Sequence, residues 1–413
     1  MQRVCLGTPA VFVTIAILLA GCGKAKPTGA VAATVISNKL VAITAAGEPV
    51  TAEQLDSWYA EPPAGENAAD IYEQAFAALS GDSGSPTFLA KNQNAIGLLI
   101  QAADRKACRY PIDLKNAFAT RLPHLQQVKS SAQLLSIAAD DAVTKGRADT
   151  AIRMTEANVS LARSLQDEPI LISRLVASAS LALAVQPIEQ LLSHGPLTDD
   201  QLAELQQAFR DANGLVSYRS AFVGERTMMI AAFQATREQS KAMNADSETN
   251  TFDIDAYKKT DTYNADFNFT LDAANSLIAY ADKEFPAALE FKAEKPDSKY
   301  VISQMVVPPM QNILVRPAET SARLRLVQTA LAIERYRLAH ADALPAGLSD
   351  LTPRLLPGND GLDPFDGKPL RYKKLSNGYL LYSIGRDRKD DGGKRQTTNK
   401  NGTSGDITFT VTR

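Results

Sequence analysis

The sequence contains few of the residue types on which most enzyme sites depend. Its 413 residues include three cysteines, three histidines and one tryptophan. The histidines, His124, His194 and His340, share no metal-ligand spacing, and the His-Glu-x-x-His motif of zinc proteases is missing. Phosphate-binding glycine loops, the Gly-x-Ser-x-Gly motif of hydrolases and the dinucleotide fingerprint are missing as well. The sequence therefore identifies no catalytic constellation.

An excess of either charge is also missing. The chain has 44 lysines and arginines against 46 aspartates and glutamates, a formal net charge of −2. Proteins that bind nucleic acid in bulk carry a basic surface, which this balance does not provide. We therefore expect no nucleic-acid partner.

The N-terminal segment has the three parts of an export signal. Arg3 supplies a positive charge, and residues 11–20 form an apolar run that is shorter than the about 20 residues a spanning helix needs. The following Leu19-Ala20-Gly21-Cys22 resembles the lipobox of bacterial lipoproteins. That resemblance implies that residues 1–21 are a signal peptide and that Cys22 is lipidated with acyl chains such as palmitate. Gly23 at the next position implies the outer membrane of a bacterial cell envelope, facing the periplasm.

The expected processing leaves one cysteine. Cys5 is lost with the signal peptide and Cys22 carries lipid, so only Cys108 remains in the mature chain. No intramolecular disulfide can form, although the compartment permits one. Cys108 is interpreted as a small core residue rather than a reactive thiol.

The middle of the chain predicts helices. Residues 22–50 are rich in small residues and predict a flexible tether, and residues 51–315 predict an α-helical domain of antiparallel hairpins. Residues 145–152 resemble the centre of a tetratricopeptide unit, but the pattern does not recur at the expected period of about 34 residues. A repeat-like solenoid is therefore the less favoured alternative.

The pattern changes in residues 316–413, which predict a small α+β domain. Pro317 opens an amphipathic helix, and three period-two segments at 370–372, 379–384 and 406–411 predict an antiparallel sheet. Asn377-Gly378 predicts the hairpin between the first two strands. The fold class is thus mainly α followed by one helix on an antiparallel sheet. Four arginines surround the apolar face of that helix: Arg323, Arg325, Arg335 and Arg337.

The C-terminal region resembles the major pseudopilins of type II secretion. The resemblance rests on residues 362–372, on Tyr382-Ser383-Ile384-Gly385-Arg386-Asp387 and on Asp406-Ile407. In that family the last loop binds calcium, which takes six to eight oxygen ligands. Carried over, Asp387 and Asp406 match the ligands of that family, and Asp390 or Asp391 are further candidates.

Two departures from the family bear on this site and on assembly. Arg388 stands where the family has glycine, and Lys394, Arg395 and Lys400 add positive charge, so the alternative is a salt-bridged or solvated loop. Pseudopilins polymerise through an exposed N-terminal apolar helix, whereas here the corresponding helix is internal. We therefore expect no pilus-like filament.

Two functions fit the sequence. The first is a lipid-anchored binding or scaffold protein of the bacterial envelope, with an envelope protein as partner and a link to secretion. The alternative is an envelope hydrolase whose acidic catalytic residues converge only in the fold. A cluster of aromatic residues predicts either a groove for a peptide or glycan or part of the core. It comprises Tyr257, Tyr263, Phe267, Phe269, Tyr280 and Phe285.

Overall fold

The structure is a computed structural model that describes residues 29–236, 238–239, 253–399 and 402–413. The expected signal peptide and Cys22 lie outside these residues. The α-helices are α1 Gly29–Ala45, α2 Ala52–Trp58, α3 Ala69–Ala78, α4 Phe88–Lys91, α5 Gln93–Ala103, α6 His124–Thr144, α7 Ala148–Arg163, α8 Leu171–His194, α9 Asp199–Asp211, α10 Arg219–Gln234, α12 Ile254–Lys258, α13 Tyr263–Ala281, α14 Val301–Val306 and α15 Val315–Ala339.

Within the residues that the structure describes, short 3₁₀ helices and five strands complete the fold. The 3₁₀ helices are η1 Leu114–Ala119, η2 Ala212–Val216, η3 Ala287–Glu290, η4 Pro308–Met310 and η5 Leu348–Leu351. The strands are β1 Arg371–Leu375, β2 Gly378–Ser383, β3 Thr397–Asn399, β4 Gly402–Ser404 and β5 Ile407–Thr412.

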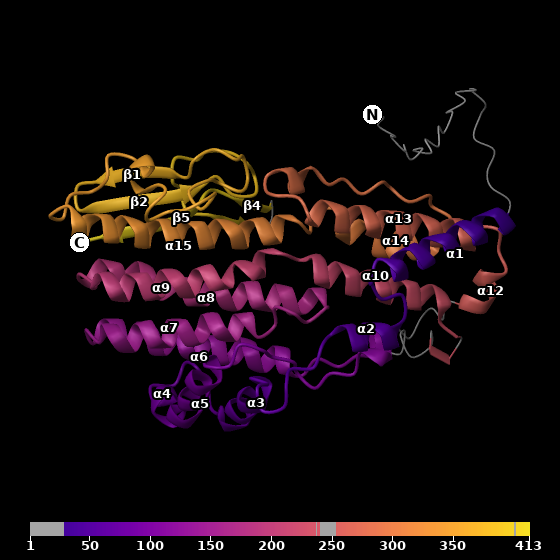
Figure 1. The fold of residues 1–413 in the computed structure, drawn as a ribbon, viewed down its shortest axis with the longest axis horizontal. Coiled ribbons are helices and arrows are strands. Elements are labelled where there is room, and N and C mark those ends of the chain that lie inside the picture. Colours follow the sequence, from indigo (N-terminus) through magenta and orange to yellow (C-terminus); the bar gives the residue numbers. More distant parts are fainter. Residues whose placement is uncertain (1–28, 237, 240–252, 400–401) are drawn as a thin grey trace, which may run out of the picture.

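The molecule is elongated, and its layers run along the long axis (Figure 1). In one half, helices α3 to α5 lie at one side, followed by α6 and α7, then α8 and α9, then α15, with the sheet on the outside. The other half holds α1, α2, α10, α12, α13 and α14. The expected fold class, mainly α with a small C-terminal sheet against one helix, is confirmed.

Helix α8 is the central helix of the stack. It contacts α6, α7, α15 and β5. By length and composition alone its 24 residues could span a membrane, which the sequence analysis did not anticipate. However, the Arg174 side chain within α8 is 2 % exposed and donates to the carbonyls of Gln166 and Gly214. Because α8 is packed among α6, α7, α15 and β5, its apolar composition is that of the core helix of a bundle.

One continuous apolar core joins the helical layers to the sheet. It includes Leu135 of α6, Leu181 of α8, Val327 of α15 and Phe409 of β5. Helix α15 packs against α8 and α9 on one side and against β2 and β5 on the other. The core therefore does not break at residue 316, and α15 is shared by the bundle and the sheet.

The sheet is an antiparallel meander in the order β1-β2-β5. Leu375 pairs with Gly378, so Ser376 and Asn377 form the hairpin loop, one residue earlier than expected. Gly378 begins β2 at φ 153°, and a Cβ there would lie 1.9 Å from the Val411 carbonyl oxygen. Glycine is needed because β5 approaches the backbone at this point.

The expectation of a flexible tether is wrong for residues 29–45, which form α1. Ala32, Ile36 and Ile43 are buried on one face of this helix, which packs against α13. Lys39 forms an ion pair with Asp272 of α13 and donates to Asn268 at 2.6 Å. The small residues that suggested a tether also form helix readily once one face is covered by a neighbour.

The aromatic cluster contributes to the core. Phe267 stacks on Phe233 with ring centroids 4.4 Å apart, and both rings are buried. The buried Tyr257 hydroxyl donates to Asp266 at 2.7 Å. The core interpretation is confirmed for Tyr257 and Phe267.

Candidate functional site

Three of the four aspartates of the expected calcium site, Asp387, Asp390 and Asp406, accept hydrogen bonds from backbone amides. Both oxygens of Asp406 accept N–H groups, from Gly393 at 2.7 Å and Asp391 at 3.4 Å. Asp387 accepts from Lys389 and Gly405, each at 3.2 Å. Asp390 accepts from Gly392 at 3.0 Å. These carboxylates are used to shape the loop, and no observation shows Asp391 completing a ligand set with them.

The donor set does not fit calcium in this arrangement. Within the described part of the chain, no group of three or more His, Cys, Asp or Glu side chains is placed to hold a metal ion. Arg371 lies 3.6 Å from Asp390 and adds a positive charge to the loop. Arg388 takes a left-handed conformation at φ 56°, which glycine adopts more readily than arginine.

Asp363, in the Asp-Pro-Phe turn, holds the sheet together. Its carboxylate is fully buried and accepts from Phe365 N–H at 3.0 Å, Ile384 N–H at 2.9 Å and Ser383 Oγ at 2.8 Å. Arg371 binds it at 2.9 Å. Burial raises the pKa of Asp363, and these donors counteract the rise. The most distinctive residue of the pseudopilin resemblance therefore has a structural role.

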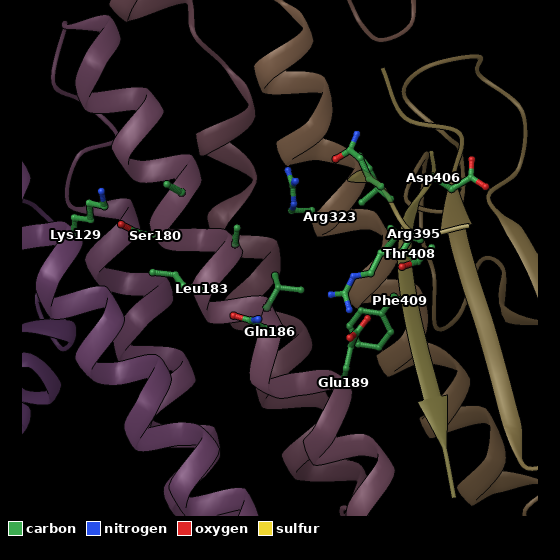
Figure 2. Close-up of a pocket in the computed structure, with 16 residues that line it drawn as sticks. Lys129, Ser180, Leu183, Gln186, Glu189, Arg323, Arg395, Asp406, Thr408 and Phe409 are labelled. Carbon is green, nitrogen blue, oxygen red and sulfur yellow. The ribbon is translucent and has the colours of Figure 1, made fainter. Parts of the chain in front are cut away.

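A cavity of about 550 Å³ lies where α8, α15 and β5 meet. Its volume falls within the about 300–1,000 Å³ typical of small-ligand sites. Leu183 of α8, Leu326 of α15 and Phe409 of β5 form apolar walls, and the segment around Arg395 closes one side (Figure 2). A ligand here would touch three elements that are distant in the sequence.

Three cations line this cavity: Lys129 of α6, Arg323 of α15 and Arg395. None of them forms an ion pair with another described residue, and Arg323 is half-buried. Burial lowers the pKa of Arg323, the charge of Glu319 opposes the shift, and Arg386 and Arg316 reinforce it. Glu319 itself binds Arg386 at 2.7 Å and Arg316 at 3.5 Å. The positive charge at Arg323 is thus left without a direct partner.

The other arginines that surround the apolar face of α15, unlike Arg323, each have a direct hydrogen-bond or ion-pair partner. Arg325 donates to the Leu362 carbonyl at 2.8 Å, Arg335 pairs with Asp199 at 2.7 Å, and Arg337 pairs with Glu334 at 2.9 Å. The sequence placed all four arginines around one helix but did not distinguish them. The only sequence signal for a site was their unusual density beside an apolar face.

The two acidic residues of the cavity wall do not converge. Glu189 Oε1 accepts the Thr410 N–H at 3.1 Å; burial raises the pKa of Glu189, and Arg395 opposes the shift. The Asp406 carboxylate points away from α8, toward the amides of residues 391 and 393 (Figure 2). The negative charge of Asp406 is therefore directed out of the cavity.

Two polar atoms in the cavity wall lack hydrogen bonds within the described chain. They are Ser180 Oγ, on a residue that is 1 % exposed, and Gln396 Nε2. Buried polar atoms in proteins almost always have a partner. Both atoms are themselves inaccessible to solvent, so the open polar capacity of the cavity comes from its cations.

The remaining candidates from the sequence are structural. Burial raises the pKa of the Cys108 thiol to about 12, which keeps it protonated and unreactive. The buried His124 places its Nε2 atom 3.0 Å from Glu168 Oε2, and the His124 ring stacks on Tyr110. The Glu168 carboxylate also accepts a hydrogen bond from Ser173 Oγ. None of these residues lines a described cavity. The exposed His194 and His340 are each hydrogen-bonded through Nδ1 to the backbone carbonyl four residues earlier, at 2.9 and 2.7 Å respectively.

No protein-family model, curated protein sequence or solved structure matches this chain.

Proposed function

We propose that this is a binding protein that takes an anionic ligand with an apolar portion into the cavity between α8, α15 and β5. The observation that carries the proposal is the unpaired, half-buried guanidinium of Arg323. Taking a cation out of water is unfavourable unless an anion pairs with it. A ligand carboxylate would supply that anion, and arginine binds carboxylates with two parallel hydrogen bonds.

The walls of the cavity support the apolar part of the ligand. Leu183, Leu326 and Phe409 offer carbon surface, while Arg395 and Lys129 add positive charge to the lining. A fully polar anion would leave this apolar surface unused. We also propose that the protein works in the bacterial envelope, attached by lipid at Cys22, where an envelope protein provides the ligand.

The hydrolase alternative receives less support. An acid–base mechanism needs two carboxylates that reach the same substrate atoms. Glu189 is bonded to β5, and Asp406 is bonded to its own loop. The cavity therefore fits binding better than hydrolysis.

The test measures binding of 4-phenylbutyrate to the full chain by titration calorimetry, with neutral 4-phenylbutanol as the matched probe. We expect phenylbutyrate to bind at least about tenfold more tightly than phenylbutanol, which corresponds to about 1.4 kcal/mol. Arg323→Gln should remove this preference. Arg121→Gln is the control, because Arg121 is an exposed arginine outside the cavity.

The outcomes separate clearly. Equal binding of the two probes, or equal preference in wild type and Arg323→Gln, would overturn the proposal. Lipid attachment is tested separately by metabolic labelling with a palmitate analogue. A Cys22→Ala protein that still incorporates the label would contradict lipidation at Cys22.

A further inference from the structure

We infer that the ligand is the C-terminal end of an extended peptide, which pairs with the open edge of β5 at Thr408. This inference rests on the proposed function, because it uses the same cavity. It adds the class of partner: a chain end with a free carboxylate, an apolar side chain and an extended backbone.

The outer edge of β5 is occupied at its C-terminal end. The Thr410 N–H donates to Glu189 Oε1 at 3.1 Å, and the Thr412 N–H donates to Ser193 Oγ at 3.2 Å. Both acceptors belong to α8, so these amides point away from β2. Helix α8 therefore seals the edge of the sheet along residues 410–412.

The edge is also occupied at its N-terminal end. The Asp406 N–H donates to the Lys394 carbonyl, and the Asp406 carbonyl accepts the Gln396 N–H, both at 2.8 Å. The segment of residues 394–396 thus acts as a short neighbouring strand beside Asp406. Two of its residues, Arg395 and Gln396, also line the cavity.

Thr408 lies between these two covered stretches. In an antiparallel strand the backbone groups alternate in direction, so residue 408 points the same way as residues 410 and 412. Its N–H and C=O therefore face the cavity, which Thr408 lines. No described group outside the sheet bonds to them. The edge has an opening one residue wide that offers one donor and one acceptor.

This pair of groups discriminates between kinds of anion. A simple carboxylate or a fully deprotonated phosphate can accept from the Thr408 N–H, but neither can donate to its C=O. An extended peptide residue provides both an acceptor and a donor, as in the addition of a strand to a sheet edge. Strand addition is favoured where an edge is left unpaired.

The cations then determine the direction of the bound peptide and the position of its C-terminal carboxylate. Figure 2 shows Arg323 and Arg395 directed toward α8, across the space next to Thr408. A terminal carboxylate would lie between them, and the preceding side chain would contact Leu183. The limited volume of about 550 Å³ admits a short chain end rather than a long internal segment.

The experiment compares three forms of the peptide acetyl-Ala-Thr-Ala-Leu on the full chain, by titration calorimetry. These are the free acid, the C-terminal amide, and free acids N-methylated at successive backbone positions. We expect the free acid to bind about tenfold or more tightly than the amide. At least one N-methylated acid should bind about tenfold more weakly than the free acid, because methylation removes the donor to the Thr408 carbonyl. Deuterium exchange of residues 407–409 should slow when the free acid binds.

The two proposals fail in different ways. If phenylbutyrate binds through Arg323 but every N-methylated acid binds as well as the parent, or exchange at 407–409 is unchanged, the strand-pairing inference is overturned and the proposed function stands. If the amide binds as well as the acid, recognition of a chain end is overturned. If neither phenylbutyrate nor any peptide binds, both proposals fall.

Discussion

Two arginines, one at each end of this elongated molecule, differ in whether an acidic side chain pairs with them. At the end built from α10 and α13, the Arg226 side chain is 3 % exposed, bonds Glu48 at 2.5 Å and donates to Asn275 at 2.9 Å. Arg219 binds the other oxygen of Glu48. At the end with the sheet, Arg323 is half-buried beside Arg386 and Arg316 without a direct partner. A paired arginine joins elements, whereas an unpaired one retains its charge for a ligand.

The same contrast applies to buried carboxylates. Asp266 is fully buried and accepts from Tyr257 and from the amides of Ile302 and Ser303, which anchors α14. Asp363 and Asp406 are likewise saturated by donors on their own side of the sheet. Around the cavity, by contrast, Lys129, Arg323 and Arg395 form no ion pair with another described residue. This difference, rather than any sequence motif, locates the candidate site.

The largest effect on stability is expected from breaking the ion pair between Glu48 and Arg226. Glu48→Gln should destabilise the protein by about 3 kcal/mol in urea unfolding at neutral pH, because it leaves Arg226 buried without its anion. Burial raises the pKa of Glu48, but the hydrogen bonds and charges of Arg226 and Arg219 outweigh it and lower that pKa overall. The folded pKa is therefore below the unfolded one. The contribution of the pair should be present above about pH 4.5 and lost as pH falls through the folded pKa.

The matched change at the other end should behave differently. Arg323→Gln should alter the free energy of unfolding by less than about 1 kcal/mol, because no partner is left behind. A loss for Arg323→Gln as large as that for Glu48→Gln would contradict the distinction between the two ends.

A smaller effect is expected at the loop that resembles the pseudopilin calcium site. Asp406→Asn should destabilise the protein by about 1–3 kcal/mol, because an amide N–H₂ would face the Gly393 N–H. Since the carboxylate oxygens already bind amides, millimolar calcium should leave the melting temperature of the wild type unchanged. Asp200→Asn is the control, at an exposed helix start. A calcium-dependent rise that is lost in Asp406→Asn would restore the calcium site.

The helical bundle contains an acidic counterpart to Arg323. Burial raises the pKa of Glu156 on α7 to about 7, and the charge of Glu204 adds to the shift. Because its folded pKa exceeds the unfolded one, the protonated form favours folding, and stability should fall as pH rises from about 4.3 to 7. Glu156→Gln should flatten this slope and stabilise the protein by about 1 kcal/mol at neutral pH, once solvent screening is allowed for.

The measurement for Glu156 is the free energy of unfolding as a function of pH. Glu204→Gln should give a smaller change of the same sign, because it removes only the second contribution to the shift. A pH slope identical to that of the wild type in Glu156→Gln would contradict this account.

The smallest effect is expected at Arg388. Its φ of 56° disfavours any side chain with a Cβ, so Arg388→Gly should stabilise the fold by less than about 1 kcal/mol. The gain is limited because Arg388 also donates to the Leu289 carbonyl at 3.3 Å. Urea unfolding of the variant measures it, and a clear loss of stability would show that this contact outweighs the backbone strain.

The sequence by itself determined most of the secondary structure. Thr198 and Gln201 form a capping box at the start of α9, and Gly146 takes the left-handed conformation in the turn after α6. The three period-two segments form β1, β2 and β5. These features are local, since capping, glycine conformation and side-chain periodicity act over a few residues. The sequence could not show that α1 is a helix, because its stability comes from α13, more than two hundred residues away along the chain.

Only the tertiary structure decided the candidate site. Arg323 and Arg325 are two residues apart in one helix, yet Arg325 meets the Leu362 carbonyl and Arg323 faces the cavity. The opening at Thr408 depends on where α8 and residues 394–396 cover β5. Whether a charge finds a partner depends on contacts between distant segments, and the fold, not the local pattern, sets those contacts.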